Sequence, residues 1–256
     1  MKYLDVILNK RWLPLIGPLL LFAFWQLIIS AQWVKPVLLP PPGETLVHAW
    51  GTLASGSIYA DLWATIFRTL CSFAIAVAIG VPLGVMLGSS VNAYRSVEFL
   101  IDFFRSTPSS ALIPLFLLIF GITDINKIAI ASFGAMLIVL FNSAYGVMNA
   151  KKTRVMAAQI MGVSRWHVFK DVMLMESLAQ TFVGLRSAVS MALVIVIVAE
   201  MFIGSENGLG HRIIDAQQVL NVKTMYAAIL AAGALGYALN VLFLLAERKI
   251  VHWSGR

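Results

Sequence analysis

Charged and hydroxylated side chains inside long apolar runs are the residues of this sequence with the potential for chemistry. Asp102 and Arg105 lie one helical turn apart in one such run, and Glu200 lies near the end of another. Charges at membrane depth are costly and usually face a protein interior or a water-filled path. The candidate lining of such a path is Arg105, Ser106, Thr107, Pro108, Ser109, Asn142 and Glu200.

A purely structural role for these residues is open as well. Pro108 and Pro114 each remove a helical hydrogen bond, and a broken segment at membrane depth is tolerated where it lines a cavity or lies buried in protein. Arg105 could equally pair with Asp102, or extend its charged end to the aqueous interface.

Patterns of known catalytic sites are missing from the sequence. It contains no G-x-x-x-x-G-K-[ST] phosphate loop and no H-E-x-x-H zinc motif, and its four histidines lie in separate loops. The single cysteine, Cys71, lies in an apolar run and can build neither a disulfide framework nor a cysteine zinc site. We therefore expect no catalytic site, no metal site and no cofactor in this chain.

The composition indicates a membrane protein. Hydrophobic residues make up 60% of the 256-residue chain and charged residues only 12%, against about 25% charged in soluble domains. So few polar residues could not cover a soluble globule. The formal charge of +7 does not indicate nucleic-acid binding, because the positive residues are spread over several loops rather than gathered in one patch.

We predict an all-α polytopic fold of about six transmembrane helices. The first apolar run follows a basic tail (1–12) and is read as a retained helix, because it is longer than a signal-peptide core. The expected spans are about 13–29, 62–87, 99–120, 128–147, 186–203 and 225–246.

Two features of the first hundred residues have structural explanations. The proline-rich stretch 37–44 is expected to be a stiff, non-helical connector, followed at 44–59 by an amphipathic helix at the membrane surface. Gly80, Gly84 and Gly88 recur every four residues and form a face for close helix packing.

The distribution of basic residues predicts the orientation. About 14 of the 19 Lys and Arg fall on the side of the N-terminus, so both termini and the loop 149–185 are expected in the cytoplasm. We divide the chain into residues 1–60 (first helix, connector and surface helix) and residues 61–250 (the main transmembrane domain).

The loop 149–185 is the longest polar interruption of the chain. Ala157, Ala158 and Gly162 lie among basic residues and predict two short helices joined by a tight turn. Small side chains let another surface approach the backbone closely. The alternative is a basic loop that only sets the topology.

The order of residues in this loop resembles the coupling motif of permease subunits of ATP-binding-cassette importers, E-A-A-x3-G-x9-I-x-L-P. Ala157, Ala158, Gly162 and Leu174 match, and Val172 substitutes for isoleucine. The chain departs from the motif by having methionine in place of both its glutamate and its proline. The departing residues are Met156 and Met175.

Further segments resemble the nitrate, sulfonate and taurine branch of that family. They cover residues from about 36 to 250 and include Leu39–Pro42, Arg105–Pro108, Phe120–Ile122, Ala157–Arg165, Gly184–Arg186, Ala199-Glu200 and Gly208–Gly210.

The resemblance implies a type I importer permease in the bacterial inner membrane. Two permease chains would form the pathway, two ATPase subunits carrying ATP and Mg would dock on the loops, and a periplasmic or lipid-anchored binding protein would deliver substrate. The implied coupling residues are Ala157, Ala158, Gln159, Gly162, Val163, Ser164, Arg165 and Leu174.

Two questions stay open from the sequence. The resemblance implies a small anion or a vitamin precursor as substrate without choosing between them. The alternative function is an ion-coupled carrier or channel without an ATPase, in which Asp102 and Glu200 would act on the ion.

Overall fold

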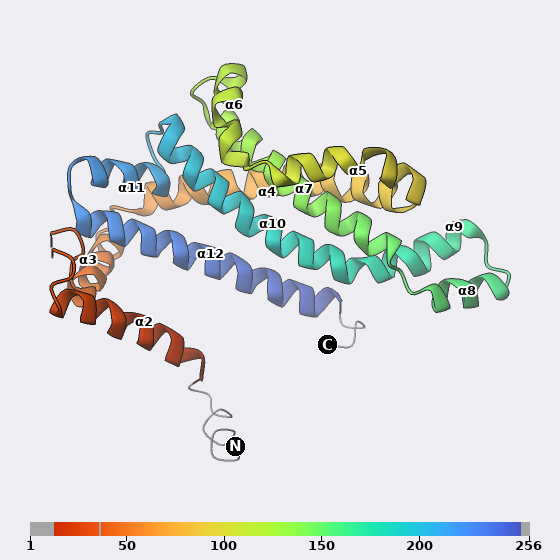
Figure 1. Cartoon of the computed structure of the whole chain (residues 1–256), viewed down its shortest axis with the longest axis horizontal. Coiled ribbons are helices and arrows are strands. Elements are labelled where there is room, and N and C mark those ends of the chain that lie inside the picture. The colour runs from red at the N-terminus through yellow and green to blue at the C-terminus, as the bar shows by residue number, and fades with distance from the viewer. Residues whose placement is uncertain (1–12, 36, 252–256) are drawn as a thin grey trace, which may run out of the picture. The chain divides into compact units, whose positions relative to one another are not determined.

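The computed structural model describes residues 13–35 and 37–251, and every regular element in that part of the chain is helical. This confirms the predicted all-α fold; the basic tail (1–12) lies outside the described residues. Figure 1 shows the order of the helices: α2 (Leu13–Ser30), α3 (Pro42–Ala54), α4 (Tyr59–Gly88), α5 (Val91–Ser106), α6 (Ile113–Phe120), α7 (Asp124–Met148), α8 (Lys152–Ile160), α9 (Arg165–His167), α10 (Leu174–Ile203), α11 (Leu209–Gln218) and α12 (Val222–Ile250).

Among the described residues, four helical segments are long and apolar enough to cross a membrane, which confirms a polytopic fold. They are α4, α7, α12 and the segment Arg165–Ile203 that contains α9 and α10. A fifth span is present if the bent pair α5 and α6 is taken as one. The predicted first span, α2, is a shorter apolar helix. The prediction of about six spans thus exceeds the four or five that meet the criteria of length and hydropathy.

The predicted third span is not one helix. α5 ends at Ser106, a short 3-10 turn follows (η1, Ser109–Leu112), and α6 continues at 88° to α5. Thr107 adopts φ −79° and ψ 122°, the extended conformation that a following proline imposes. Pro108 therefore ends α5, and the broken segment expected from the sequence consists of two separate helices.

The surface helix α3 begins two residues earlier than predicted. Pro42 is its first residue and Glu44 lies in its first turn, so the connector is not fully non-helical. A proline is tolerated here because the N–H of the first helical residue has no partner within the helix. Val47 and Trp50 are 74% and 73% exposed, as expected of a helix at a membrane surface.

The described residues form two compact units, each with its own contacts. One comprises the chain up to Tyr59 together with Arg212–Leu230, and the other comprises Ala60–His211 and the residues from Ala231 onward. In the first unit, α3 is tied to the start of α12 by a 2.7 Å ion pair between Glu44 and Lys223.

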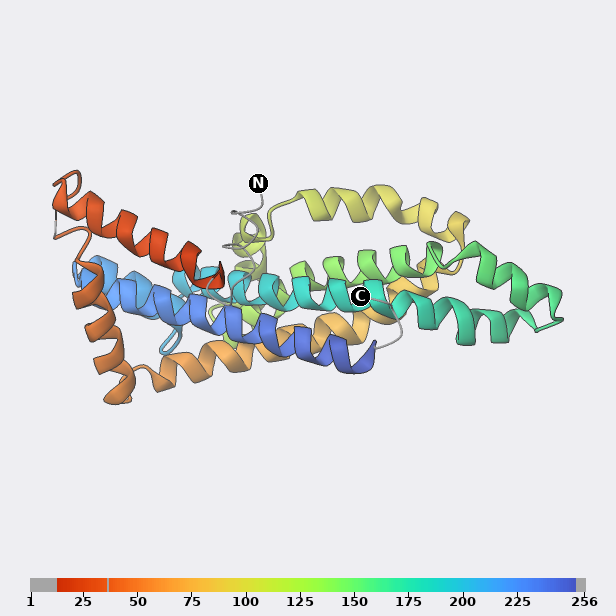
Figure 2. The ribbon, with the colours of Figure 1, turned by 90° about the horizontal axis from the view of Figure 1, so that it is seen from below.

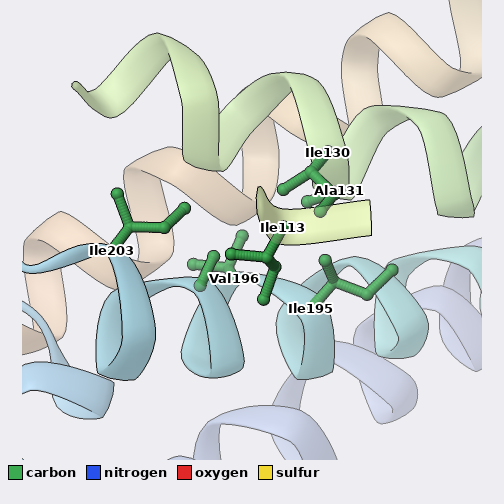
Figure 3. Close-up of a cluster of buried hydrophobic side chains, with 7 residues drawn as sticks. Ile113, Ile130, Ala131, Ile195, Val196 and Ile203 are labelled. Atoms are coloured by element: carbon green, nitrogen blue, oxygen red, sulfur yellow. The ribbon is translucent and has the colours of Figure 1, made fainter. Parts of the chain in front are cut away.

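In the second unit, α7 and α10 lie side by side, as Figures 1 and 2 both show. Apolar side chains from these two helices and α6 interlock in a buried cluster (Figure 3). Within a membrane such packing stabilises through van der Waals contact, because lipid is as apolar as the side chains. The cluster comprises Ile113, Ile130, Ala131, Ile195, Val196, Ala199 and Ile203.

The glycine face of α4 packs against α7, as predicted. A Cβ added at Gly84 would lie 2.5 Å from the carbonyl oxygen of Leu140, and one added at Gly88 would lie 2.5 Å from that of Ala144. The two backbones are therefore too close for any side chain at these positions.

Candidate functional site

The loop between α7 and α10 forms two short helices joined by a tight turn. Gly162 follows α8 with φ +75°, a left-handed conformation that glycine adopts without steric cost. The N–H of Gly162 donates to the carbonyl of Gln159 at 3.0 Å, and that of Val163 donates to the carbonyl of Ala158 at 3.1 Å. This pair of bonds is the Schellman motif.

The Schellman motif relates the small residues to one another, since Gly162 forms the turn that ends the helix of Ala157 and Ala158. Ala157 and Ala158 lie in the last turn of α8, and their carbonyls accept the N–H groups of Met161 and Val163, respectively. Ser164 then caps the next helix, because its Oγ accepts the N–H of His167 and lies 2.8 Å from the Nδ1 of that residue. The predicted helix–turn–helix is therefore present, with one cap on each side of the turn.

After the turn, the chain continues without a break into the spanning helix. α9 leads into a π-helical stretch (η2, Val168–Met173) and then into α10. Met175 replaces the proline of the motif, and the helix runs through Glu176 and Ser177, as expected in the absence of a proline. Leu174 is the first residue of α10.

The turn presents an apolar tip. No residue of α8 is buried, and the exposed fractions of Ile160, Met161 and Trp166 are 87%, 81% and 65%. Gln159 and Arg165 are exposed beside them. Large apolar side chains exposed together mark interaction surfaces.

Arg105, the candidate pathway residue at the end of α5, is ion-paired. Its Nη1 lies 3.3 Å from a carboxylate oxygen of Asp102, which is the ion pair that the sequence analysis gave as a structural alternative. Its guanidinium carbon lies 3.9 Å from the ring centroid of Phe141 on α7. The two charged side chains remain 38% and 60% exposed. The hydroxyl of Thr107 donates to the carbonyl of Phe103, which also accepts the N–H of Thr107.

The remaining candidate pathway residues do not form a single cluster with Arg105. Asn142 of α7 accepts a 2.8 Å hydrogen bond from Gln180 of α10, and Ser109 is buried with its side chain close to Gly134. Glu200 lies near the far end of α10 and has no exposed surface.

Glu200 is held by a buried polar network that the sequence reasoning missed. Its carboxylate accepts the hydroxyl of Thr65 at 2.9 Å and pairs with Arg68 at 2.6 Å. Arg68 also pairs with Asp124 at 2.9 Å, which brings in the start of α7. The sequence pattern that could have revealed the network is a polar stripe along the apolar helix α4. Its members are spaced by four, three and four residues: Asp61, Thr65, Arg68 and Ser72.

The same network caps the first turn of α11. The backbone N–H groups of Gly208, Leu209 and Gly210 donate at 2.9 Å to the side chains of Asp61, Thr65 and Glu200, respectively. These donors have no partner within the helix, so side chains from α4 and α10 satisfy them. Gly208 has φ +151° and lies against the Glu200 carboxylate, which leaves no room for a side chain.

A cavity of about 820 Å³, lined by both polar and apolar residues, opens beside this network. It lies at the start of α7 and the end of α10, so the lengths of these helices separate it from the α8–α9 turn. Its lining includes Trp63, Arg68, Asp124, Lys127, Ser205 and Asn207.

Comparison with known proteins is consistent with this geometry. Residues 80–252 match the family described as binding-protein-dependent transport system inner membrane component. The putative aliphatic sulfonates transport permease protein SsuC of Escherichia coli (strain K12) is 33% identical over 249 residues, which cover 96% of this chain and 94% of the relative. The taurine transport system permease protein TauC of the same strain is 28% identical over 241 residues, with 92% and 87% covered.

The fold has a solved counterpart in a chain of the inward-facing MetNI methionine ABC transporter. The TM-score is 0.66 at 20% identity, and the match covers 75% of this chain and 95% of that one. The chain described here therefore belongs to the family of binding-protein-dependent transport system inner membrane components, as a multi-pass permease subunit of an ATP-binding-cassette importer.

Proposed function

We propose that two copies of this chain form a pathway for an organosulfonate and that two ATPase subunits dock on the α8–α9 turn. A substrate-binding protein delivers the solute at the opposite end of α7 and α10. ATP and Mg bind to the ATPases, and this chain catalyses no reaction itself. In this arrangement both termini and the docking turn lie in the cytoplasm, in agreement with the basic residues on that side.

The observation that carries the proposal is the Schellman turn at Gly162. It presents Ala157 and Ala158 with their backbone approachable, next to the exposed apolar side chains of Ile160 and Met161. A loop that only set the topology would have no need of a defined turn with an apolar tip. A groove in an ATPase subunit could cover this tip and remove its apolar surface from water.

The exposed charges of α5 support the pairing of two copies. Asp102 and Arg105 lie in a bent span, and both remain partly exposed. Charged groups at membrane depth face protein or water rather than lipid. A second copy facing α5 would enclose these side chains, together with the polar break around Pro108, in a water-filled pathway.

The choice of a sulfonate rests on the names of the relatives and on Arg105. The two Escherichia coli relatives are described as permeases for aliphatic sulfonates and for taurine. A sulfonate is an anion with three oxygens, and a guanidinium binds such groups through paired hydrogen bonds. The pairing with Asp102 leaves part of the Arg105 side chain exposed for this contact.

Ion-coupled transport without an ATPase has less support. The carboxylate of Glu200 has no solvent access and is neutralised by Arg68, so it is not placed to pick up and release an ion. Asp102 is likewise paired, with Arg105.

The test is transport by the assembled complex in proteoliposomes, with its ATPase and binding protein and with labelled taurine as the probe. The proposal expects taurine uptake that requires MgATP and the binding protein. Uptake that is driven by an ion gradient in the absence of the ATPase would overturn it. If another solute is taken up with ATP and taurine does not compete with it, the assignment of an organosulfonate as substrate is wrong, while the ATP-driven mechanism stands.

A further inference from the structure

We propose that Glu176 is the positioning residue that fixes α8 to α10, so that movement of the docking turn is transmitted to the spanning helix. The proposal rests on the proposed function of the α8–α9 turn in ATPase docking. Glu176 lies outside the matched positions of the coupling motif.

Glu176 binds α8 through both carboxylate oxygens. One accepts the backbone N–H of Lys151, the residue that precedes α8, at 2.6 Å, and the other pairs with the guanidinium of Arg154 at 2.5 Å. The Glu176 side chain is only 13% exposed, whereas that of Arg154 is 58% exposed. A negative charge at the start of a helix also complements the helix dipole.

Apart from Glu176, α8 contacts the π-helical stretch η2. None of its residues is buried, and no side chain of Lys151 caps its start. Within the described part of the chain, Glu176 makes the ion pair and the side-chain hydrogen bond that join α8 to α10. A cavity of about 390 Å³ opens beside this contact and is lined by Arg154, Asp171, Val172, Met175 and Glu176. The start of α8 is therefore held to α10 by this one carboxylate.

α10 is suited to transmit a displacement of that carboxylate. It is a single helix from Leu174 to Ile203, about 45 Å long. Glu176 lies in its first turn, and Glu200, near its other end, binds Arg68 and the N–H of Gly210. Met175, in place of the motif's proline, leaves the backbone hydrogen bonds of the helix unbroken beside Glu176, so a displacement there is carried along α10.

Without Glu176, α8 would be held by the Schellman turn that follows it, by the loop before it and by its contacts with η2. A docked ATPase could then shift the start of α8 relative to α10. ATP hydrolysis would continue, and transport per ATP hydrolysed would fall. A residue needed only for stability would lower assembly, hydrolysis and transport together, so the ratio separates the two roles.

The first experiment measures the position of α8 by pulsed electron paramagnetic resonance. Spin labels are placed at Thr153 on α8 and Ser187 on α10, both exposed, in a Cys71→Ser background of the full-length protein. Glu176→Ala is compared with Asp171→Asn, a matched control in which an exposed acid of the same cleft is neutralised. Glu176→Gln keeps the acceptor for the Lys151 N–H and loses the charge.

We expect one narrow distance in the parent protein and in Asp171→Asn, and a broad distribution in Glu176→Ala. Loss of a hydrogen bond to a charged group shifts an equilibrium by about tenfold or more. Molecules in which α8 is no longer held to α10 should therefore make up most of the Glu176→Ala sample. Glu176→Gln should be intermediate. Identical narrow distributions in the parent and in Glu176→Ala would overturn the proposal.

The second experiment measures taurine transport per ATP hydrolysed in the reconstituted complex. We expect Glu176→Ala to hydrolyse ATP with a transport ratio about tenfold lower. An unchanged ratio, or a parallel loss of assembly and hydrolysis, would overturn the positioning role. If the parent complex moves no taurine, the substrate proposal fails, and the distance measurement still decides the role of Glu176.

Discussion

The guanidinium of Arg68 lies 2.6 Å from the carboxylate of Glu200, and the two side chains are 6% and 0% exposed. This buried pair joins the first half of α4 to the last turns of α10. The same carboxylate accepts the N–H of Gly210 and so holds the first turn of α11 as well. The end of α10 opposite the α8–α9 turn is thus held by a few polar contacts among apolar helices.

Removing one partner of this pair should destabilise the protein strongly. Arg68→Ala leaves Glu200 buried and unpaired and should cost about 3–5 kcal/mol. The double variant Arg68→Met with Glu200→Leu should cost less than Arg68→Ala, because it removes both charges. Thermal unfolding in detergent, followed by circular dichroism, measures the difference. Unfolding of Arg68→Ala at the temperature of the parent protein would contradict this account of the network.

The contact between α4 and α7 should tolerate no side chain at Gly84. Gly84→Ala would place a methyl group against the backbone oxygen of Leu140, which cannot move aside, and should cost about 1–3 kcal/mol. Gly233→Ala is the matched control, because a Cβ at that helical position has no neighbour within 4 Å. The control should be neutral or stabilising by about 0.4–1 kcal/mol. Equal stability of the two variants would refute the close packing of α4 on α7.

Much of this fold could be predicted from sequence, because hydropathy and glycine spacing act locally. The main spans, the glycine face of α4 and the turn at Gly162 each depend on residues within one or two helical turns. The network around Glu200 could not be assigned in this way. Its partner Arg68 lies 132 positions away, and only the packing of α4 on α7 and α10 brings them together. The 88° angle between α5 and α6 could not be predicted from the sequence either, because a proline predicts that a helix breaks but not the angle of the break.

Arg105 should contribute to transport more than to assembly. Arg105→Gln removes the charge near the ring of Phe141 and should lower taurine transport about tenfold, the effect of losing one charge-assisted bond. Recovery of the ATPase with the variant should be unchanged, because the contacts of Arg105 are with Asp102 of α5 and Phe141 of α7. Asp102→Asn serves as the control, since it frees Arg105 and should preserve transport. Full transport by Arg105→Gln would exclude a role for this residue in the pathway.

The most direct test of the central claim is the subunit composition of the purified complex with and without a usable turn at Gly162. Native mass spectrometry of the tagged permease, co-expressed with its ATPase, should show two permeases and two ATPases. Gly162→Asn should retain this composition, because asparagine tolerates the left-handed backbone at φ +75°. Gly162→Trp should show the permease without ATPase, because the bulky side chain strains the turn and blocks approach to α8. A complete complex with Gly162→Trp would show that the ATPase docks elsewhere.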